Sequence, residues 1–141
     1  MIGDPRDLGR RVARRFMPRG VRPTVRDVAA QMGVEIRERP APPPAQPGLR
    51  SEYQPSPPQI ILYRDSIDNL AAAVHANQRF DILACNLDEV HIAHELFHHI
   101  ECGQRFGPLR SEEVEAAAQS FAEALLDLSF HPDELSGLQP F

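Results

Sequence analysis

The densest group of potentially reactive side chains lies between residues 91 and 99, which contain four of the six histidines of the chain. Within this group, His94, Glu95 and His98 form the pattern His-Glu-x-x-His. Residues four apart are neighbours on one face of a helix, so both imidazoles can reach a single zinc ion while the backbone stays regular. The pattern is typical of zinc peptidases, in which the glutamate lies beside the metal-binding pair. We therefore predict a helix over residues 88–102 with a zinc site on one face.

Other potential ligands lie on the same helix. At about 100° per residue, His91, Glu101 and Cys102 fall in the same sector as the histidine pair, whereas His99 points away and is expected to face solvent. The helix rises about 1.5 Å per residue, which puts the nearer of these groups about 5 Å beyond the pair along the axis. Such a third ligand would give poor tetrahedral geometry. We expect His91, Glu101 and Cys102 to be partly buried packing residues, and they remain alternative ligands.

A second strong helical pattern, over residues 112–128, offers the missing ligand. Its apolar residues form one arc; Glu115 lies inside that arc, while the other three glutamates lie outside it or at its margin. A carboxylate is almost never buried unless it is paired or binds a metal. Glu115 is therefore expected to be the third ligand, the alternative being a partly covered glutamate at the rim of the packing. Gln119, one turn later, is expected to hydrogen-bond a ligand.

The rest of the chain must position this site, and its patterns of apolar residues, prolines and glycines predict the elements that do so. Thr24 fits an N-cap and Gly33 a C-cap, while Ile60–Tyr63 is apolar enough for a core strand. The predicted helices cover residues 4–17, 24–33, 66–76, 88–102 and 112–128; the predicted strands cover 34–39, 49–54 and 58–65; residues 40–48 form a proline-rich loop and 79–86 a short strand or turn.

These elements predict an α+β fold, in which a small, mostly antiparallel sheet packs on a helical bundle that contains the two site helices. A chain of 141 residues is expected to form one domain, 1–141, with an Arg-rich N-terminal helix (1–21), a core (22–128) and a C-terminal tail (129–141). That length can bury a core without a metal, so a metal would serve function rather than folding.

Cysteine usage and hydropathy bear on the location of the protein. Cys85 and Cys102 fit neither a disulfide framework nor a Cys-x-x-Cys site, and no signal-like segment precedes the Arg-rich start. No apolar run approaches the ~20 residues that cross a bilayer. We expect a soluble protein in the reducing cytoplasm, without a membrane partner.

Positive charge is concentrated at the N-terminus. Residues 1–26 contain eight arginines against Asp4 and Asp7, in a chain whose net charge is -5. A basic segment can bind nucleic acid, but a solvated helix face explains the same pattern. Residues 24–34 are similar to the first helix and turn of a helix-turn-helix module, yet a strand pattern and prolines follow where the recognition helix should stand. The sequence therefore argues against nucleic-acid binding.

Two segments together resemble a known family. His94–His98 is followed by a helix in which Glu115–Leu126 is similar to the pattern E-x-x-A-[N/D]-x-F-A-x-x-L-L of the ImmA/IrrE metallopeptidases, which are of the gluzincin type. The likeness extends over roughly residues 22–128. This chain departs from the family at Gln119, where Asn or Asp is usual, at Phe97, where a small residue is common, and at residues 125–132, where LLMP is usual.

The resemblance implies a zincin-like domain in which His94, His98 and Glu115 hold Zn²⁺ and Glu95 is the catalytic base. It also implies an intracellular endopeptidase with a protein substrate, which in several members is a helix-turn-helix repressor. His131 and Tyr63 are candidates for stabilising the oxyanion. Ile60–Tyr63, if it lies at the sheet edge, could bind an extended substrate.

Two other functional classes remain open at this level. One is a catalytically silent zinc-binding module that acts in regulation or as a toxin–antitoxin-type partner. The other is a nucleic-acid binder in which the histidines are structural and the Arg-rich start makes the contact.

Overall fold

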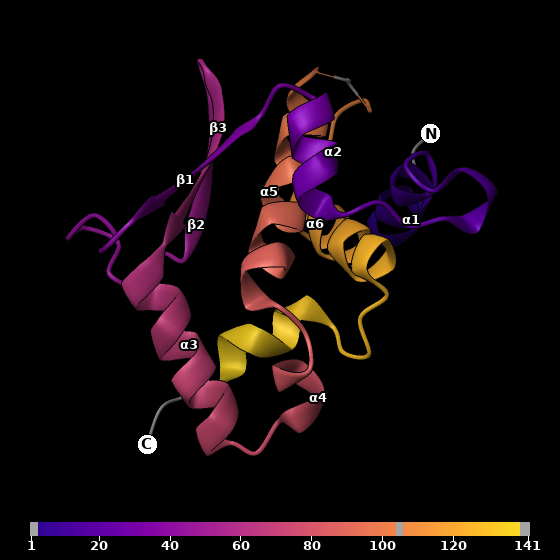
Figure 1. The fold of residues 1–141 in the computed structure, drawn as a ribbon. Helices are drawn as coiled ribbons and strands as arrows, with labels where there is room; N and C mark the ends of the chain where they lie inside the picture. Colours follow the sequence, from indigo (N-terminus) through magenta and orange to yellow (C-terminus); the bar gives the residue numbers. More distant parts are fainter. Residues whose placement is uncertain (1–2, 104–105, 139–141) are drawn as a thin grey trace.

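The computed structural model describes residues 3–103 and 106–138, and the fold is α+β (Figure 1). The sheet lies on one side of the long helix α5, with α6 and then α1 beyond α5. In chain order the elements are α1 (Pro5–Arg14), η1 (Pro18–Gly20), α2 (Val25–Gln31), β1 (Glu35–Arg39), β2 (Ser51–Pro55), β3 (Pro58–Tyr63), α3 (Arg64–Ala76), α4 (Phe80–Leu83), α5 (Leu87–Gly103), α6 (Ser111–Leu126) and η2 (Pro132–Gly137).

The sheet has three strands in the order β1-β3-β2 and is mixed, not mostly antiparallel as predicted. A tight turn joins β2 to β3, so these strands run antiparallel, with Tyr53 opposite Ile60. The proline-rich loop before β2 instead returns the chain so that β1 and β3 run parallel. β3 is therefore the central strand, and the possibility that Ile60–Tyr63 forms the edge is wrong. The edge strand beside α5 is β2.

The core forms where α5 packs between the sheet and α6. Ile60 and Leu62 of β3 are fully buried and belong to the same apolar cluster as Leu96 and Phe97 of α5. On the other side of α5, the rings of Phe97 and Phe121 lie 5.7 Å apart, which fixes α5 against α6. The two helices that were predicted to form the site are thus locked together by apolar contacts.

The packing of α1 on α6 depends on Gly9. A Cβ atom at this position would lie 2.1 Å from the Ala117 carbonyl oxygen and 2.8 Å from the Phe121 amide nitrogen. Only glycine allows the two backbones to approach so closely. The N-terminal helix is therefore a packed element of the fold, with its arginines on the outer surface.

Several predicted details are confirmed and others change. The Thr24 hydroxyl accepts a hydrogen bond from the Asp27 amide at 3.2 Å, as expected of an N-cap, and Gly33 has φ +72° at the end of α2. Residues 79–86 contain the single-turn helix α4 instead of a strand, because the turn closes on itself through Leu83 N–Arg79 O and Ala84 N–Phe80 O bonds.

The segment predicted as a C-terminal tail is structured over residues 129–138. It contains η2, and Phe130 and Leu135 are 4% and 3% exposed within the core cluster. Their apolar side chains explain this packing. Residues 139–141 lie outside the described part. No helix in the described ranges is long and apolar enough to span a membrane.

Candidate metal centre

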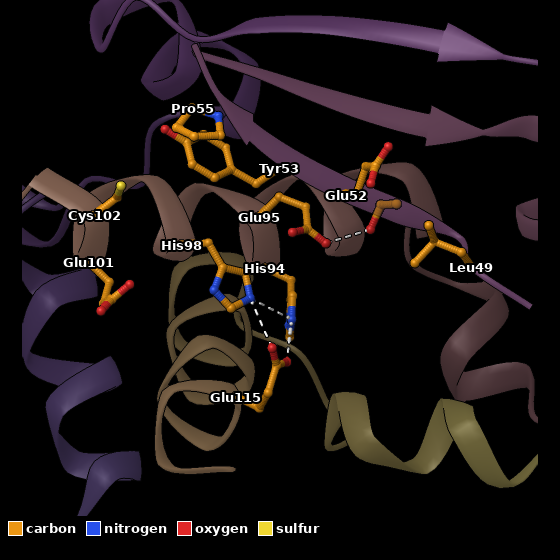
Figure 2. Close-up of a pocket in the computed structure, with 11 residues that line it drawn as sticks. Leu49, Glu52, Tyr53, Pro55, His94, Glu95, His98, Glu101, Cys102 and Glu115 are labelled. Atoms are coloured by element: carbon orange, nitrogen blue, oxygen red, sulfur yellow. Dashed lines mark hydrogen bonds and ion pairs between the residues drawn. The ribbon is translucent and has the colours of Figure 1, made fainter. Parts of the chain in front are cut away.

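His94 and His98 lie one turn apart on α5, and both point toward α6 (Figure 2). Their ring centroids are 5.1 Å apart and their Nε2 atoms 3.3 Å apart. The intervening Leu96 and Phe97 are fully buried, which holds this stretch of helix in place. The predicted pairing of the two imidazoles on one face is confirmed.

Glu115 reaches this pair from the first turn of α6. Its two carboxylate oxygens lie 2.9 Å from His94 Nε2 and 3.1 Å from His98 Nε2. Hydrogen bonds from His94 and His98 hold the pKa of the Glu115 carboxyl well below its usual range. Burial lowers the pKa of His98, but the hydrogen bond to Glu115 and the negative charges of Glu95, Glu115 and Glu101 together outweigh it, and the net direction is upward. Glu115 therefore lies where a third ligand is required.

Contrary to the prediction, Glu115 is not buried. Its side chain is 51% exposed, because the α6 residues that enter the core are Ala117, Ala118 and Phe121, and Glu115 stays at the rim of the packing. This position matches the alternative considered from the sequence, a partly covered glutamate at the rim of the packing. The carboxylate is ordered by the two histidines and not by burial.

The geometry of the three side chains suits a divalent metal such as zinc. One donor atom from each residue can be chosen so that all three lie within 4.8 Å of one another. Tetrahedral zinc with bonds of about 2.0–2.1 Å separates its ligand atoms by about 3.3 Å. The two imidazole Nε2 atoms are 3.3 Å apart, and each is 2.9–3.1 Å from a carboxylate oxygen. Two histidines and one carboxylate also match the donor set of catalytic zinc, which leaves a fourth position free. The group could hold a metal ion.

The alternative ligands on α5 do not join this group. His91 is 9% exposed, and its Nδ1 lies 2.7 Å from the Leu87 carbonyl oxygen, so it is a packing residue. Burial lowers the pKa of His91 to about 4. Glu101 and Cys102 line the same hollow as the pair but lie further along the helix (Figure 2). Within the described ranges, the metal-binding group contains neither of them.

Glu95 lies beside the metal-binding group and is not part of it. It is 7% exposed and points toward β2, where its Oε2 accepts a hydrogen bond from Ser51 Oγ at 2.8 Å (Figure 2). Ser51 is itself 8% exposed. Ser51 was not predicted to lie at the site, since its contact with Glu95 depends on where the edge strand lies relative to α5. The only feature of the sequence that could have indicated Ser51 is that it is a polar residue at an inward-facing position at the start of a strand.

His99 and Gln119, two other residues near the site, lie differently from what the sequence predicts. His99 is only partly exposed to solvent: its Nδ1 lies 2.7 Å from the Tyr53 hydroxyl, and both side chains are half-buried because β2 covers this side of α5. Gln119 is half-buried in the wall of a neighbouring hollow, and among the described residues it forms no hydrogen bond with a candidate ligand.

Tyr63 and His131, the two residues considered for stabilising the oxyanion, form hydrogen bonds with other side chains. The Tyr63 hydroxyl donates to Glu52 at 2.6 Å, and His131 Nδ1 lies 2.8 Å from a Glu123 oxygen. Burial raises the pKa of Tyr63 to about 12. Neither side chain lines the hollow that contains the histidine pair.

Two hollows meet at the candidate site. The larger, of about 530 Å³, extends along β2 past Tyr53 and Pro55. The smaller, of about 230 Å³, lies between α5, the start of β2 and η2. They share Leu49, Ser51, His94 and Glu95, so the candidate metal and base lie where the hollows join.

Comparisons of the chain with protein-family models, with curated proteins and with solved structures found no significant match.

Proposed function

We propose that this protein is a zinc-dependent endopeptidase with a zincin-like active site, related to the ImmA/IrrE metallopeptidases, and that it hydrolyses a peptide bond of a protein substrate. The observation that supports this most directly is the convergence of His94, His98 and Glu115, with Glu95 immediately beside them. Such a donor set, with a carboxylate at hand but not in it, is the arrangement that metal-assisted hydrolysis requires.

His94, His98 and Glu115 would hold the zinc ion, which when bound would polarise a peptide carbonyl and lower the pKa of a nearby water molecule. Glu95 accepts the proton of the attacking water and then delivers it to the leaving nitrogen. The net reaction adds hydroxyl to the carbonyl carbon and hydrogen to the amine, and the C–N bond breaks. Ser51 holds the Glu95 carboxylate in place by the 2.8 Å hydrogen bond.

The open edge of β2 provides a place for the substrate. The Tyr63 amide donates to the Arg50 carbonyl at 2.9 Å, so Arg50 and Tyr63 form a hydrogen-bonded pair of the antiparallel ladder. By alternation, the backbone groups of Ser51 and Tyr53 point away from β3. An extended peptide can pair with them and lie across the site.

The nature of the substrate and its location belong to the same proposal. The ImmA/IrrE-like segments 94–98 and 115–126 favour a helix-turn-helix repressor as the substrate. Cys85 and Cys102 are free thiols, which suits a reducing cytoplasm.

Metal content measured by mass spectrometry tests the ligand set. We expect about one zinc per chain in the wild type and in Glu112→Gln, and a strong loss in Glu115→Gln. Glu112 is the matched control, because it is an exposed glutamate on the same helix. Failure of the wild type to bind zinc when it is supplied would remove the peptidase proposal.

Replacement of Glu95 tests the chemistry separately from the metal. Glu95→Gln should retain zinc and lose hydrolysis of a candidate repressor, assayed by electrophoresis and intact mass. If the variant keeps the cellular function of the wild type, the protein is instead a silent zinc-binding interaction module.

A further inference from the structure

The smaller hollow beside the candidate metal centre contains a cation whose charge is not balanced by a neighbour. Arg50 directly precedes the edge strand β2 and lines this hollow together with His91, His94 and Glu95. Its Nη2 donates to the Leu135 carbonyl of η2 at 3.4 Å. Within residues 3–103 and 106–138, no carboxylate forms an ion pair with it.

Among the described residues, the other partly buried arginines each have a carboxylate partner. Arg64 pairs with Glu38, Asp68 and Asp88, Arg79 with Asp81 and Glu134, and Arg6 with Asp133. Arg50 is half-buried, and burial is the cause that lowers its pKa. A guanidinium that has lost part of its hydration without gaining a carboxylate is a favourable place for an anion to bind.

Asp133 is the one other acidic residue in the wall of this hollow besides Glu95, among the described residues. One of its carboxylate oxygens lies 3.6 Å from Arg6 Nη2, and its side chain is 47% exposed. Glu95 is engaged by Ser51. Neither acid therefore balances the positive charge of Arg50. Arg50 also borders a small hollow against α3.

The direction of β2 indicates which part of a substrate would meet Arg50. β2 runs from Ser51, next to the smaller hollow, to Pro55, which lines the larger one. A peptide that pairs antiparallel with β2 runs in the opposite sense, and antiparallel pairing is slightly the more stable kind. Its N-terminal part then lies in the larger hollow, and its C-terminal part enters the smaller hollow beside Arg50.

We propose that Arg50 binds a carboxylate of the substrate on the C-terminal side of the cleaved bond, and that the protein selects peptides with such a group. This inference rests on the proposed peptidase function. The carboxylate is either the free C-terminus of a short leaving fragment or an Asp or Glu side chain within it. The hollow of about 230 Å³ has room for only a small part of a peptide, so the carboxylate lies close to the cleaved bond.

The cleavage test uses three matched peptides that share one sequence around a site the protein cleaves. The first ends two residues after the cleaved bond in a free acid, the second ends there in an amide, and the third is the amide with Glu in place of the second of these residues. We expect kcat/KM to be about 10- to 100-fold higher for a peptide with a carboxylate than for the neutral amide, as for a charge-assisted hydrogen bond. The first and third peptides distinguish a terminal carboxylate from a side chain.

Arg50→Gln should remove this preference, so that the acidic peptides are cleaved no faster than the neutral amide. Arg37→Gln is the matched control, because Arg37 is an exposed arginine on the other edge strand and bonds Glu35. Zinc content and thermal unfolding check that Arg50→Gln is folded. If it is not, Arg50→Lys keeps the charge but loses the planar fork, and the preference should shrink without vanishing.

A binding measurement separates this inference from the proposed function. Fluorescence anisotropy of the labelled peptides with Glu95→Gln protein needs no turnover. Tighter binding of either acidic peptide, lost in the Arg50→Gln, Glu95→Gln double variant, supports the carboxylate site even if no peptide is ever cleaved. Equal binding and equal cleavage of the three peptides would overturn the role of Arg50 and leave the peptidase proposal standing.

Discussion

His91 should make the metal-free protein less stable as the pH falls, without contributing to metal binding. The imidazole is 9% exposed, and this burial favours its neutral form against the opposing effect of the Leu87 hydrogen bond. Because Nδ1 lies 2.7 Å from the Leu87 carbonyl oxygen, the proton of the neutral form is on Nδ1. Burial lowers its pKa from 6.5 to about 4, with smaller effects from the nearby Arg50 and His94 in the same direction. His91→Asn is the informative substitution, because the asparagine amide can still donate to Leu87 but does not titrate.

The sign and size of the effect follow from proton linkage. Between pH 6.5 and about 4 the unfolded chain binds a proton at residue 91 and the folded chain does not. The stability that the neutral imidazole contributes is therefore full above pH 6.5 and is lost as the pH falls toward 4. A difference of about 2.5 pH units corresponds to roughly 3 kcal/mol of unfolding free energy. This is a large fraction of the stability of a typical domain.

Urea unfolding of chelator-treated protein, followed by circular dichroism from pH 7.5 to pH 4, measures this quantity. The free energy of unfolding of the wild type minus that of His91→Asn should fall by roughly 3 kcal/mol across this range, whatever constant offset the substitution adds. His75→Asn is the control, since His75 is exposed on α3. Zinc content should be the same in His91→Asn as in the wild type. Parallel stability curves would refute the buried neutral state, and loss of zinc would place His91 among the ligands.

Three further substitutions test the framework around the site. Gly9→Ala should cost about 3 kcal/mol or more in urea unfolding, because its Cβ would lie 2.1 Å from a backbone oxygen of α6, whereas Gly137→Ala, with nothing within 4 Å, should cost little. Ser51→Ala should lower kcat about 10-fold, because Glu95 loses the hydrogen bond from Ser51 on β2. KM and zinc content should stay unchanged. An unchanged kcat would show that Ser51 does not position the base. Thr24→Ala should lower the free energy of unfolding by about 1 kcal/mol, and Thr24→Asn should restore it if the cap is responsible.

Local spacing was sufficient to predict part of the site. His94, Glu95 and His98 belong to one helix, and helical periodicity alone places the two imidazoles together. Glu115 was predicted from a second helical arc, and its position beside the pair is confirmed while its burial is not. The error arises because a helical wheel gives the direction of a side chain but not how far the neighbouring helix extends over it.

The contribution of the sheet could not be predicted in the same way. Ser51 and Arg50 reach the site only because β2 is the edge strand, and the strand order depends on how the proline-rich loop returns the chain. A one-residue shift in the pairing of β2 would turn Ser51 away from Glu95. His99 is less exposed than predicted for the same reason, because its partner Tyr53 belongs to this strand.

The separation between the apolar core and the candidate ligands bears on what a metal would do here. The buried cluster joins α5 to α6 through Phe97 and Phe121, and none of the three ligand residues belongs to it. Glu115 is half exposed at the rim of that packing, and it reaches both histidines from near the start of α6. The positions of the donors are therefore set by packing that is complete without them. In a domain built this way a metal would add little to folding, which fits the catalytic ion that we propose better than a structural one.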